Sequence, residues 1–263
     1  MYDAEIISIG NELLIGKTVN TNATWIARKL TLLGFNVKRI VTVGDIIEDI
    51  VSALRESISR GAKVIIITGG LGPTFDDKTS EALAVALRKP WVINYEALQM
   101  VKEKYYKMGL ELTPHRVKMA KMPEGSIPLP NPIGTAPGIL IREKECLIIS
   151  LPGVPKEMKA IFEEHVEPVL KNIGPHLCFS EKTITVKGIP ESSLAPVLDL
   201  VMKNVSKVYI KSHPRGAEGE KPVIELHITS SGKNMEEVKY HIEKASDILL
   251  KLIREKFQKF QIE

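Results

Sequence analysis

The chain has 263 residues, of which 44% are apolar and 26% charged, so it is long enough for one large or two modest soluble globular domains. Its net charge of only +4 and its 5% of aromatic residues argue against nucleic-acid binding, which needs a basic surface or stacking platforms. No apolar run is long enough for a membrane span, and the N-terminus leads straight into a predicted strand rather than a signal peptide. We therefore expect a cytoplasmic protein without membrane or nucleic-acid partners.

The first 120 residues alternate between strand and helix patterns. The predicted strands cover residues 3–9, 35–43 and 64–67, and an amphipathic helix follows each of them. Residues suited to start or end these and two later helices stand at their boundaries: Asn20 or Thr21, Asp45, Pro90, Asn94 and Thr113-Pro114. This alternation is typical of βαβ units in a mostly parallel sheet with right-handed crossovers.

The strand at 64–67 and the turn after it organise the rest of the chain. Four consecutive apolar residues, all β-branched, predict a strand buried on both faces, and three glycines follow within the four positions 69–72. Asp76 and Asp77 come next, and a helix start is predicted at 78–83. A strand, glycine turn and helix direct backbone N–H groups at an anion, and the two carboxylates could hold a cation or water against it. A tight turn in which Asp76 or Asp77 caps the helix is an equal alternative.

A second unit of strand, glycine turn and helix is predicted after Pro123, where the composition of the chain changes. A Pro- and Gly-rich loop covers 129–138, a hairpin is predicted over 139–150, and Pro155 takes the first position of the next helix. Gly174-Pro175 marks a composition break, and we predict a first domain over 1–172 and a small α+β domain over 173–263. The second domain reads as strand, helix, two strands and a long helix, with a polar loop from His213 to Lys221.

Parallel sheets bind ligands beyond the carboxyl ends of their strands, so Glu12, Asn22 and the turn at 69–77 should meet at one edge. The six histidines show no metal-ligand spacing, the two cysteines form no CxxC pair, and no GxSxG elbow is present. Any chemistry should therefore be metal-assisted or electrostatic.

Several stretches together resemble the N-terminal domain of the competence/damage-inducible protein CinA family, a relative of the molybdopterin-binding fold of MoaB, MogA and MoeA. The resemblance covers residues 4 to about 170 and is carried by these segments: 9–16 (IGNELLIG), 20–22 (NTN), 42–45 (TVGD), 68–77 (TGGLGPTFDD), 129–138 (LPNPIGTAPG) and 151–158 (LPGVPKEM). Asn11 stands where the family often has Asp, which removes one potential metal carboxylate. The amidohydrolase domain of full-length bacterial CinA does not appear, so its NMN deamidase activity is not transferred to this chain.

The resemblance implies a three-layer α/β/α fold, a homodimer and a divalent-metal-dependent nucleotide pyrophosphatase that hydrolyses ADP-ribose, or a related dinucleotide such as FAD, to AMP and a phosphorylated product. Two alternatives stay open: a molybdopterin-binding enzyme of molybdenum cofactor biosynthesis, and a non-catalytic nucleotide- or pterin-binding protein.

On this hypothesis Asp76, Asp77 and Lys78 are catalytic, and Glu12, Asp76 and Asp77 hold Mg, Mn or Co, with a monovalent cation as a further candidate. The matching segments supply the candidate substrate-binding residues: Asn11, Glu12, Asn22, Thr68, Gly69, Gly70, Leu71, Gly72, Asn131, Gly134, Thr135, Ala136, Pro137, Gly138, Pro152, Gly153, Val154, Pro155 and Glu157.

Overall fold

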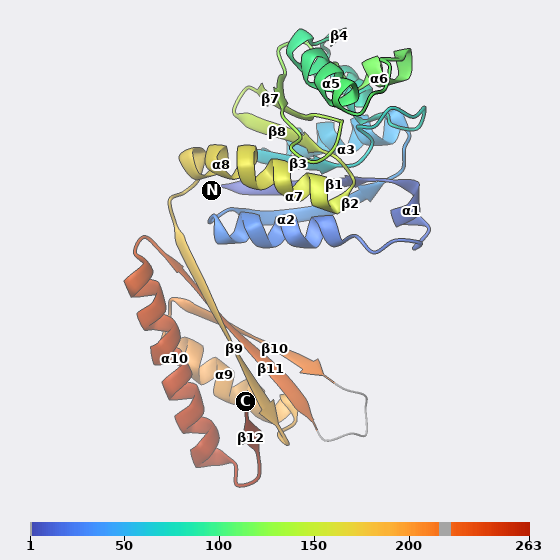
Figure 1. Ribbon diagram of the computed structural model, residues 1–263. Coiled ribbons are helices and arrows are strands. Elements are labelled where there is room, and N and C mark those ends of the chain that lie inside the picture. The colour runs from blue at the N-terminus through green and yellow to red at the C-terminus, as the bar shows by residue number, and fades with distance from the viewer. Residues whose placement is uncertain (1, 216–221) are drawn as a thin grey trace. The chain divides into compact units, whose positions relative to one another are not determined.

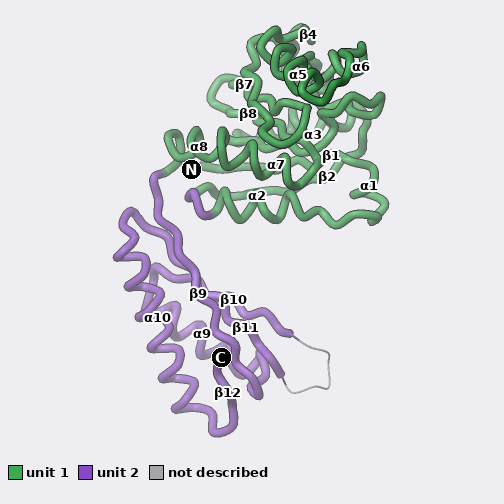
Figure 2. The backbone as a smooth tube through the Cα atoms, viewed as in Figure 1, with its two compact units in different colours: residues 1–31, 35–175 green, residues 32–34, 176–263 purple. Residues whose placement is uncertain are grey.

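The computed structural model describes residues 2–215 and 222–263 and divides the chain into two compact units (Figure 2). Unit 1 comprises the chain up to residue 31 and residues 35–175, and unit 2 comprises residues 32–34 and 176–263. The main division thus falls between Pro175 and His176, three residues after the boundary predicted from the sequence. Within the described ranges no helix combines the length and apolar character that a membrane span requires.

Unit 1 is built on a six-stranded sheet in the order β2-β1-β3-β8-β7-β6 (Figure 1). Four neighbouring strands run parallel: β2 (Asn36–Val43), β1 (Asp3–Ile9), β3 (Val64–Thr68) and β8 (Cys146–Leu151). At one edge β7 (Gly138–Glu143) runs antiparallel to β8, and β6 (Ile127–Leu129) runs antiparallel to β7 and so in the direction of the first four. All five residues of β3 are buried, as the apolar run predicts for a central strand covered on both faces.

Helices cover both faces of this sheet, which confirms the predicted three-layer α/β/α fold. One face carries α3 (Ile47–Ser59) and α4 (Thr79–Leu87), whose buried side chains share a core with Ile7, Ile65 and Ile148. The other carries α2 (Thr21–Leu32) and the continuous run of α7 (Pro155–Ile161), the π-helix η1 (Phe162–Val166) and α8 (Glu167–Ile173) (Figure 1). Trp25 of α2 packs edge-on against Phe162 of η1, with ring centroids 5.2 Å apart.

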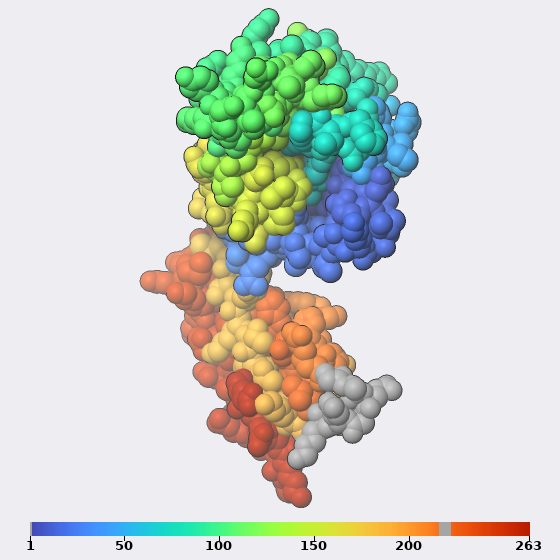
Figure 3. All heavy atoms as spheres, turned by 45° about the vertical axis from the view of Figure 1, so that its right-hand side comes forward, coloured from blue at the N-terminus to red at the C-terminus, as the bar shows by residue number. Residues whose placement is uncertain are grey.

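The remaining elements of unit 1 are short or peripheral. A one-turn helix, α1 (Asn11–Leu14), follows β1. The segment between α4 and β6 forms an outer lobe (Figures 1 and 3) that contains β4 (Trp91–Ile93), α5 (Tyr95–Lys107), α6 (Pro114–Lys118) and β5 (Lys121–Pro123). Asn94 and Thr113 cap α5 and α6 through their side chains, as predicted.

Unit 2 is a four-stranded antiparallel sheet in the order β10-β11-β9-β12, with two helices packed on it. Its elements in chain order are β9 (Cys178–Lys187), α9 (Glu191–Asn204), β10 (Val208–Arg215), β11 (Val223–Gly232), α10 (Met235–Lys256) and β12 (Gln261–Ile262). This matches the predicted α+β arrangement. The predicted loop from His213 to Lys221 is wrong at its start, because His213, Pro214 and Arg215 continue β10 opposite β11. Residues 216–221 lie outside the described residues.

Other sequence expectations differ from the structure for local reasons. Asp45 does not cap α3, which starts after Ile46 without a side-chain cap, because its carboxylate instead accepts the N–H of Asn11 at 2.9 Å. The strands β4, β5, β6 and β12 were missed, since two or three residues are too few to show a period.

The two cysteines occupy different environments. Cys146, at the start of β8, is buried, and burial raises the pKa of its thiol to about 12. Cys178, at the start of β9, is only partly buried. Neither takes part in a disulfide.

A buried ion pair braces the start of the parallel sheet. Glu5 of β1 is almost fully buried and accepts hydrogen bonds from Arg60 Nε at 2.9 Å, Arg60 Nη2 at 2.7 Å and the Ser57 hydroxyl at 2.7 Å. The hydrogen bond to Arg60, above all, lowers the pKa of Glu5 from its ordinary value. Because the folded pKa is depressed, the stabilisation is present above the unfolded pKa and is lost as pH falls through the folded value.

We expect Arg60→Gln to lower the free energy of unfolding at neutral pH by about 2 kcal/mol, because the buried Glu5 carboxylate then lacks a cationic partner. The loss is limited because solvent partly screens the original pair. The deficit should shrink as the pH falls, since a protonated Glu5 no longer needs the cation. Urea unfolding followed by circular dichroism between neutral and acidic pH measures both effects. The control is Lys63→Gln, which removes an exposed pair with Glu145 and should change little. A pH-independent deficit would contradict the assignment.

Candidate functional site

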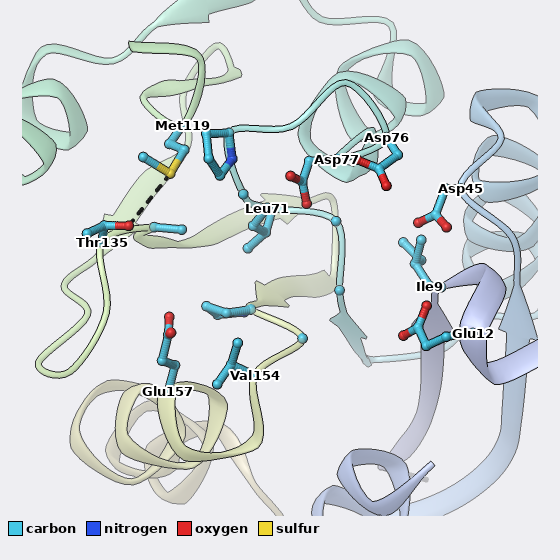
Figure 4. A pocket seen from close by; sticks show the side chains of 18 residues that line it. Ile9, Glu12, Asp45, Leu71, Asp76, Asp77, Met119, Thr135, Val154 and Glu157 are labelled. Atoms are coloured by element: carbon cyan, nitrogen blue, oxygen red, sulfur yellow. Dashed lines mark hydrogen bonds between the residues drawn. The ribbon is translucent and has the colours of Figure 1, made fainter. Parts of the chain in front are cut away.

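A pocket of about 410 Å³ opens at the carboxyl ends of β1, β3 and β8 (Figure 4). The turns after β1, β2, β3 and β8 line it, together with residues at the end of α6 and in the loop before β7. Its lining comprises Ile9, Gly10, Glu12, Asp45, Gly69, Gly70, Leu71, Gly72, Pro73, Asp76, Asp77, Met119, Thr135, Ala136, Pro152, Gly153, Val154 and Glu157.

The turn after β3 depends on glycine for two measurable reasons. Gly69 has φ +105°, and a Cβ built there would lie 2.1 Å from the carbonyl oxygen of Ile9. Gly70 has φ +63°, and its Cβ would lie 2.3 Å from the hydroxyl of Thr79. That hydroxyl donates to the Gly69 carbonyl at 2.7 Å and so ties the turn to the first residue of α4. The turn can therefore lie directly against the end of β1.

The turn after β8 packs against the first glycine turn. A Cβ on Gly153 would lie 3.4 Å from the Cα of Gly69, and the Asn22 amide donates to the Gly153 carbonyl at 2.7 Å. The side-chain oxygen of Asn22 is buried without a hydrogen-bond partner among the described residues. Asn22 also lines a smaller pocket of about 90 Å³ together with Thr68, Pro155, Glu12 and Gly153.

These two turns leave a set of backbone donors at the pocket. Five backbone N–H groups of these turns donate to no acceptor among the described residues: those of Gly70, Leu71, Gly72, Gly153 and Val154. Unsatisfied N–H groups gathered at glycine turns and helix starts are the usual means of binding a phosphate or another anion.

Asp76 and Asp77 do not cap the helix that follows them. The residue before α4 is Lys78, and α4 has no side-chain cap, so the alternative drawn from the sequence is wrong. Asp77 instead accepts from the Thr74 N–H at 2.8 Å. The Thr74 hydroxyl lies within hydrogen-bond distance of both Asp77 and Asp76, and its single proton is shared between the two carboxylates. The hydrogen bond from Thr74, followed by that from its own backbone N–H, lowers the pKa of Asp76, which favours its charged form.

Lys118 of α6 supports the same loop and was not expected from the sequence. Its ammonium donates to the Thr74 carbonyl oxygen. Burial lowers its pKa from the ordinary value, while Asp77 acts in the opposite direction. Lysine in the last turn of a short helix gives no sequence signal, because only the fold brings α6 to the turn after β3.

The pocket gathers thirteen of the predicted site residues: Glu12, Gly69, Gly70, Leu71, Gly72, Asp76, Asp77, Thr135, Ala136, Pro152, Gly153, Val154 and Glu157. Asn22, Thr68 and Pro155 line the adjoining small pocket. Six others line neither: Asn11, Lys78, Asn131, Gly134, Pro137 and Gly138. Lys78, a predicted catalytic residue, does not line the pocket, and its ammonium lies 3.7 Å from the carboxylate of Glu81 in α4.

The pocket is lined by acids, and no basic side chain of the described residues joins them. Glu12, Asp45, Asp76 and Asp77 lie toward one side of Figure 4 and Glu157 lies on the other. Asp45 was predicted as a helix cap and lies in the matching segment 42–45, but it was not among the predicted site residues. It lines the pocket because the turn after β2 ends beside those after β1 and β3.

The acidic side chains do not form a complete metal-binding group by themselves. Nowhere in the described ranges do three His, Cys, Asp or Glu side chains form a group that could hold a metal ion. Mg²⁺ requires less, since it usually takes one or two carboxylates and completes its shell with water and phosphate oxygens. Asp76 and Asp77, joined through Thr74, satisfy that requirement beside the glycine turn.

Comparisons with known proteins agree with this architecture. Residues 5–172 match the family model described as a probable molybdopterin binding domain. A protein of Pyrobaculum aerophilum is 55% identical over 254 residues, which make up 97% of this chain and 95% of that protein. The crystal structure titled as the protein CinA with unknown function, from Thermoplasma acidophilum, is 42% identical with a TM-score of 0.61 and covers 64% of this chain and 98% of its own. The resemblance to CinA is thereby confirmed for unit 1.

We expect Gly69→Ala to destabilise unit 1 by about 2 kcal/mol or more, because the new methyl meets the Ile9 carbonyl in a backbone conformation that alanine rarely adopts. Gly153→Ala, whose Cβ meets only ordinary contact distances, should cost less than about 1 kcal/mol. Denaturant unfolding of the two variants measures the difference. Equal destabilisation would mean that the close approach of β1 and β3 is not what requires glycine.

Proposed function

We propose that this chain, which belongs to the family of probable molybdopterin-binding domains, uses the pocket of unit 1 to bind a phosphate-bearing pterin of the molybdopterin type. The observation that carries the proposal is the contact between the two turns, Gly69 against Gly153, which places backbone donors of both at one pocket. Their N–H groups would hold the phosphate without any basic side chain.

A divalent cation accompanies the ligand in this proposal. Five acidic side chains and a phosphate repel one another unless a cation lies between them. Asp76 and Asp77 would hold Mg, Mn or Co, with Glu12 and Asp45 within the same pocket as further oxygen donors. Such an ion neutralises phosphate charge and lowers the pKa of a bound water. Thr74 orients Asp77 through its backbone N–H and shares its hydroxyl proton between the two aspartates, and Lys118 donates to the Thr74 carbonyl.

The acidic lining also favours a second candidate function, metal-dependent hydrolysis of a pyrophosphate such as ADP-ribose or FAD. Breaking a P–O–P bond needs charge neutralisation on both phosphates and an activated water, and carboxylates beside an anion-binding turn could support both. The two functions use the same donors and differ in the organic part of the ligand.

A product assay separates them. The chain is incubated with Mg, Mn or Co and with either molybdopterin plus ATP or ADP-ribose or FAD alone, and phosphorus NMR identifies the products. Binding or adenylylation of molybdopterin supports the pterin proposal, and AMP release from ADP-ribose or FAD supports hydrolysis. If none of these ligands binds, the proposed function is refuted.

Asp77→Asn should keep the fold and lower metal-dependent ligand binding or turnover by about 100-fold, because it removes a charge that the cation requires. Asp76→Asn should act in the same direction with an equal or smaller effect, since Asp76 is more exposed. The control is Glu81→Gln, which changes a carboxylate of α4 outside the pocket lining. Titration with Mn²⁺ and melting curves accompany the assay. Full function in both aspartate variants would exclude a metal role for this loop.

We further infer that the chain forms a homodimer through the outer lobe of unit 1. Tyr95 and Tyr106 of α5 are 84% and 86% exposed, and Met108 and Leu110 are also exposed. Exposed apolar groups gathered on one segment are typical of association surfaces. Sedimentation equilibrium should show a dimer that Tyr106→Glu converts to monomer, while Tyr240→Glu on α10 of unit 2 has no effect. A wild-type chain that stays monomeric at all concentrations would contradict this inference.

A further inference from the structure

Unit 2 has a sheet face that its own helices leave open. Ile184 of β9, Ile210 of β10 and Leu226 of β11 share one core with the buried side chains of α9 and α10. Since side chains alternate across a strand, the odd-numbered residues of these three strands point to the opposite face. Both helices of unit 2 lie on the first side, so the described part of unit 2 does not cover the second.

A pocket of about 630 Å³ lies at one end of this open face, and all the residues that line it belong to unit 2. Two aromatic side chains line it from the strands on either side of β11, Phe179 from β9 and Tyr209 from β10. Between them β11 contributes the small hydroxyl side chains of Ser231, which pairs with Phe179, and Thr229, which pairs with Tyr209. The pocket is therefore a slot with two aromatic walls and a polar floor.

The width of the slot suits one flat ring. Strands on either side of a shared neighbour lie about 10 Å apart, and Phe179 and Tyr209 are two residues out of line along them. Their Cα atoms are thus about 12 Å apart. A ring midway between them meets each wall at about 6 Å, within the range of about 4.5–7 Å over which aromatic pairs interact. Tyr209 is 59% exposed, so its ring has surface left for such a partner.

The charges at the slot favour an anionic ligand. Lys207 forms an ion pair with Glu237, the single acid among the described residues that line the pocket. Lys233 lines the same pocket and forms no ion pair within residues 2–215 and 222–263. One positive charge therefore stays uncompensated beside the aromatic walls. The pocket of unit 1 has the reverse character, since acids line it without a basic side chain.

We propose that this slot is a second ligand site, which binds a nucleoside monophosphate with its base between Phe179 and Tyr209 and its phosphate at Lys233. Stacking on aromatic side chains accepts any base, because every base has a π face. The inference goes beyond the function proposed for unit 1. It also requires no divalent cation, because Lys207 already neutralises Glu237, the one carboxylate of the lining.

The rest of the open face favours a free nucleotide over a nucleic-acid strand. Further along the same strands, Arg215 lies 2.9 Å from Glu225, and His227 lies 2.9 Å from Glu181. These pairs place acidic groups where the next phosphates of a strand would lie. The ligand should therefore be a single nucleotide.

Three compounds separate the contribution of the ring from that of the phosphate. AMP has both, adenosine lacks the phosphate, and ribose 5-phosphate lacks the ring. Calorimetric titration of the full chain in EDTA should show AMP binding about 10-fold tighter than adenosine, because the phosphate adds one charge-assisted contact. Ribose 5-phosphate should bind at least about 100-fold more weakly than AMP, because it meets neither wall.

Variants assign the binding to the slot. Tyr209→Ala and Phe179→Ala should each weaken AMP binding about 10-fold, because each removes one wall. The matched control is Tyr240→Ala, since Tyr240 of α10 is also 59% exposed and does not line the pocket. Lys233→Gln should weaken AMP binding and leave adenosine binding unchanged, whereas Lys239→Gln, an exposed change on α10, should alter neither.

Ser231→Leu tests the slot without removing a wall. Ser231 is exposed on the open face, so leucine should leave the melting temperature unchanged while its side chain fills the floor and abolishes AMP binding. Unchanged AMP binding in Ser231→Leu and Tyr209→Ala would overturn the inference.

The same titrations distinguish the slot from the pocket of unit 1 and from a site for a strand. AMP binding that appears only with Mg²⁺ would belong to unit 1 and would refute the slot, whereas metal-independent binding that Ser231→Leu abolishes supports it even if the function proposed for unit 1 fails. Equal affinity for AMP and ribose 5-phosphate, or no binding of either, would also refute it. A tetra-adenylate that bound more than about 10-fold tighter than AMP would show a strand as the occupant and overturn the assignment to a free nucleotide.

Discussion

The pocket depends on one backbone contact, the approach of Gly69 to the carbonyl oxygen of Ile9. A Cβ at position 69 would lie 2.1 Å from that oxygen. Because glycine has only a hydrogen there, the end of β3 can lie against the end of β1. The turn after β8 then packs on Gly69, and two sets of backbone donors meet at one pocket. Any Cβ at position 69 would separate strands that the rest of the sheet holds together, so the site and the stability of unit 1 share one steric condition.

The parts of this site that follow from local sequence could be predicted. The apolar run of β3, the glycines after it and Pro155 at the start of α7 each have a local physical signature, and their parallel strands place them at one edge. Asp45 has a local signature only as a helix cap, and Lys118 has none, because loops and a short helix bring them to the site from distant parts of the chain. The capping alternative for Asp76 and Asp77 was wrong because Thr74, within three residues, offers nearer donors than the helix does.

Charge is distributed unevenly around the pocket. The lining is acidic, while Lys118 holds the loop from outside it through a backbone carbonyl. A lysine pointing into the pocket would bind phosphate directly but would also neutralise the aspartates that a cation requires. Placing the cationic side chain behind the loop leaves the carboxylates at the pocket and the backbone N–H groups open to the anion that we propose.

The two thiols of the chain differ in how readily oxidants can reach and attack them. Oxidants attack thiolates, and a thiol with a pKa near 12 such as Cys146 is almost entirely protonated at neutral pH and shielded as well. Cys178, at the start of β9 in unit 2, is the sulfhydryl that peroxide or a disulfide reagent would reach first. Sulfenic acid formation or glutathionylation should therefore occur at Cys178 in unit 2. The thiol in the sheet that carries the proposed ligand pocket should stay reduced.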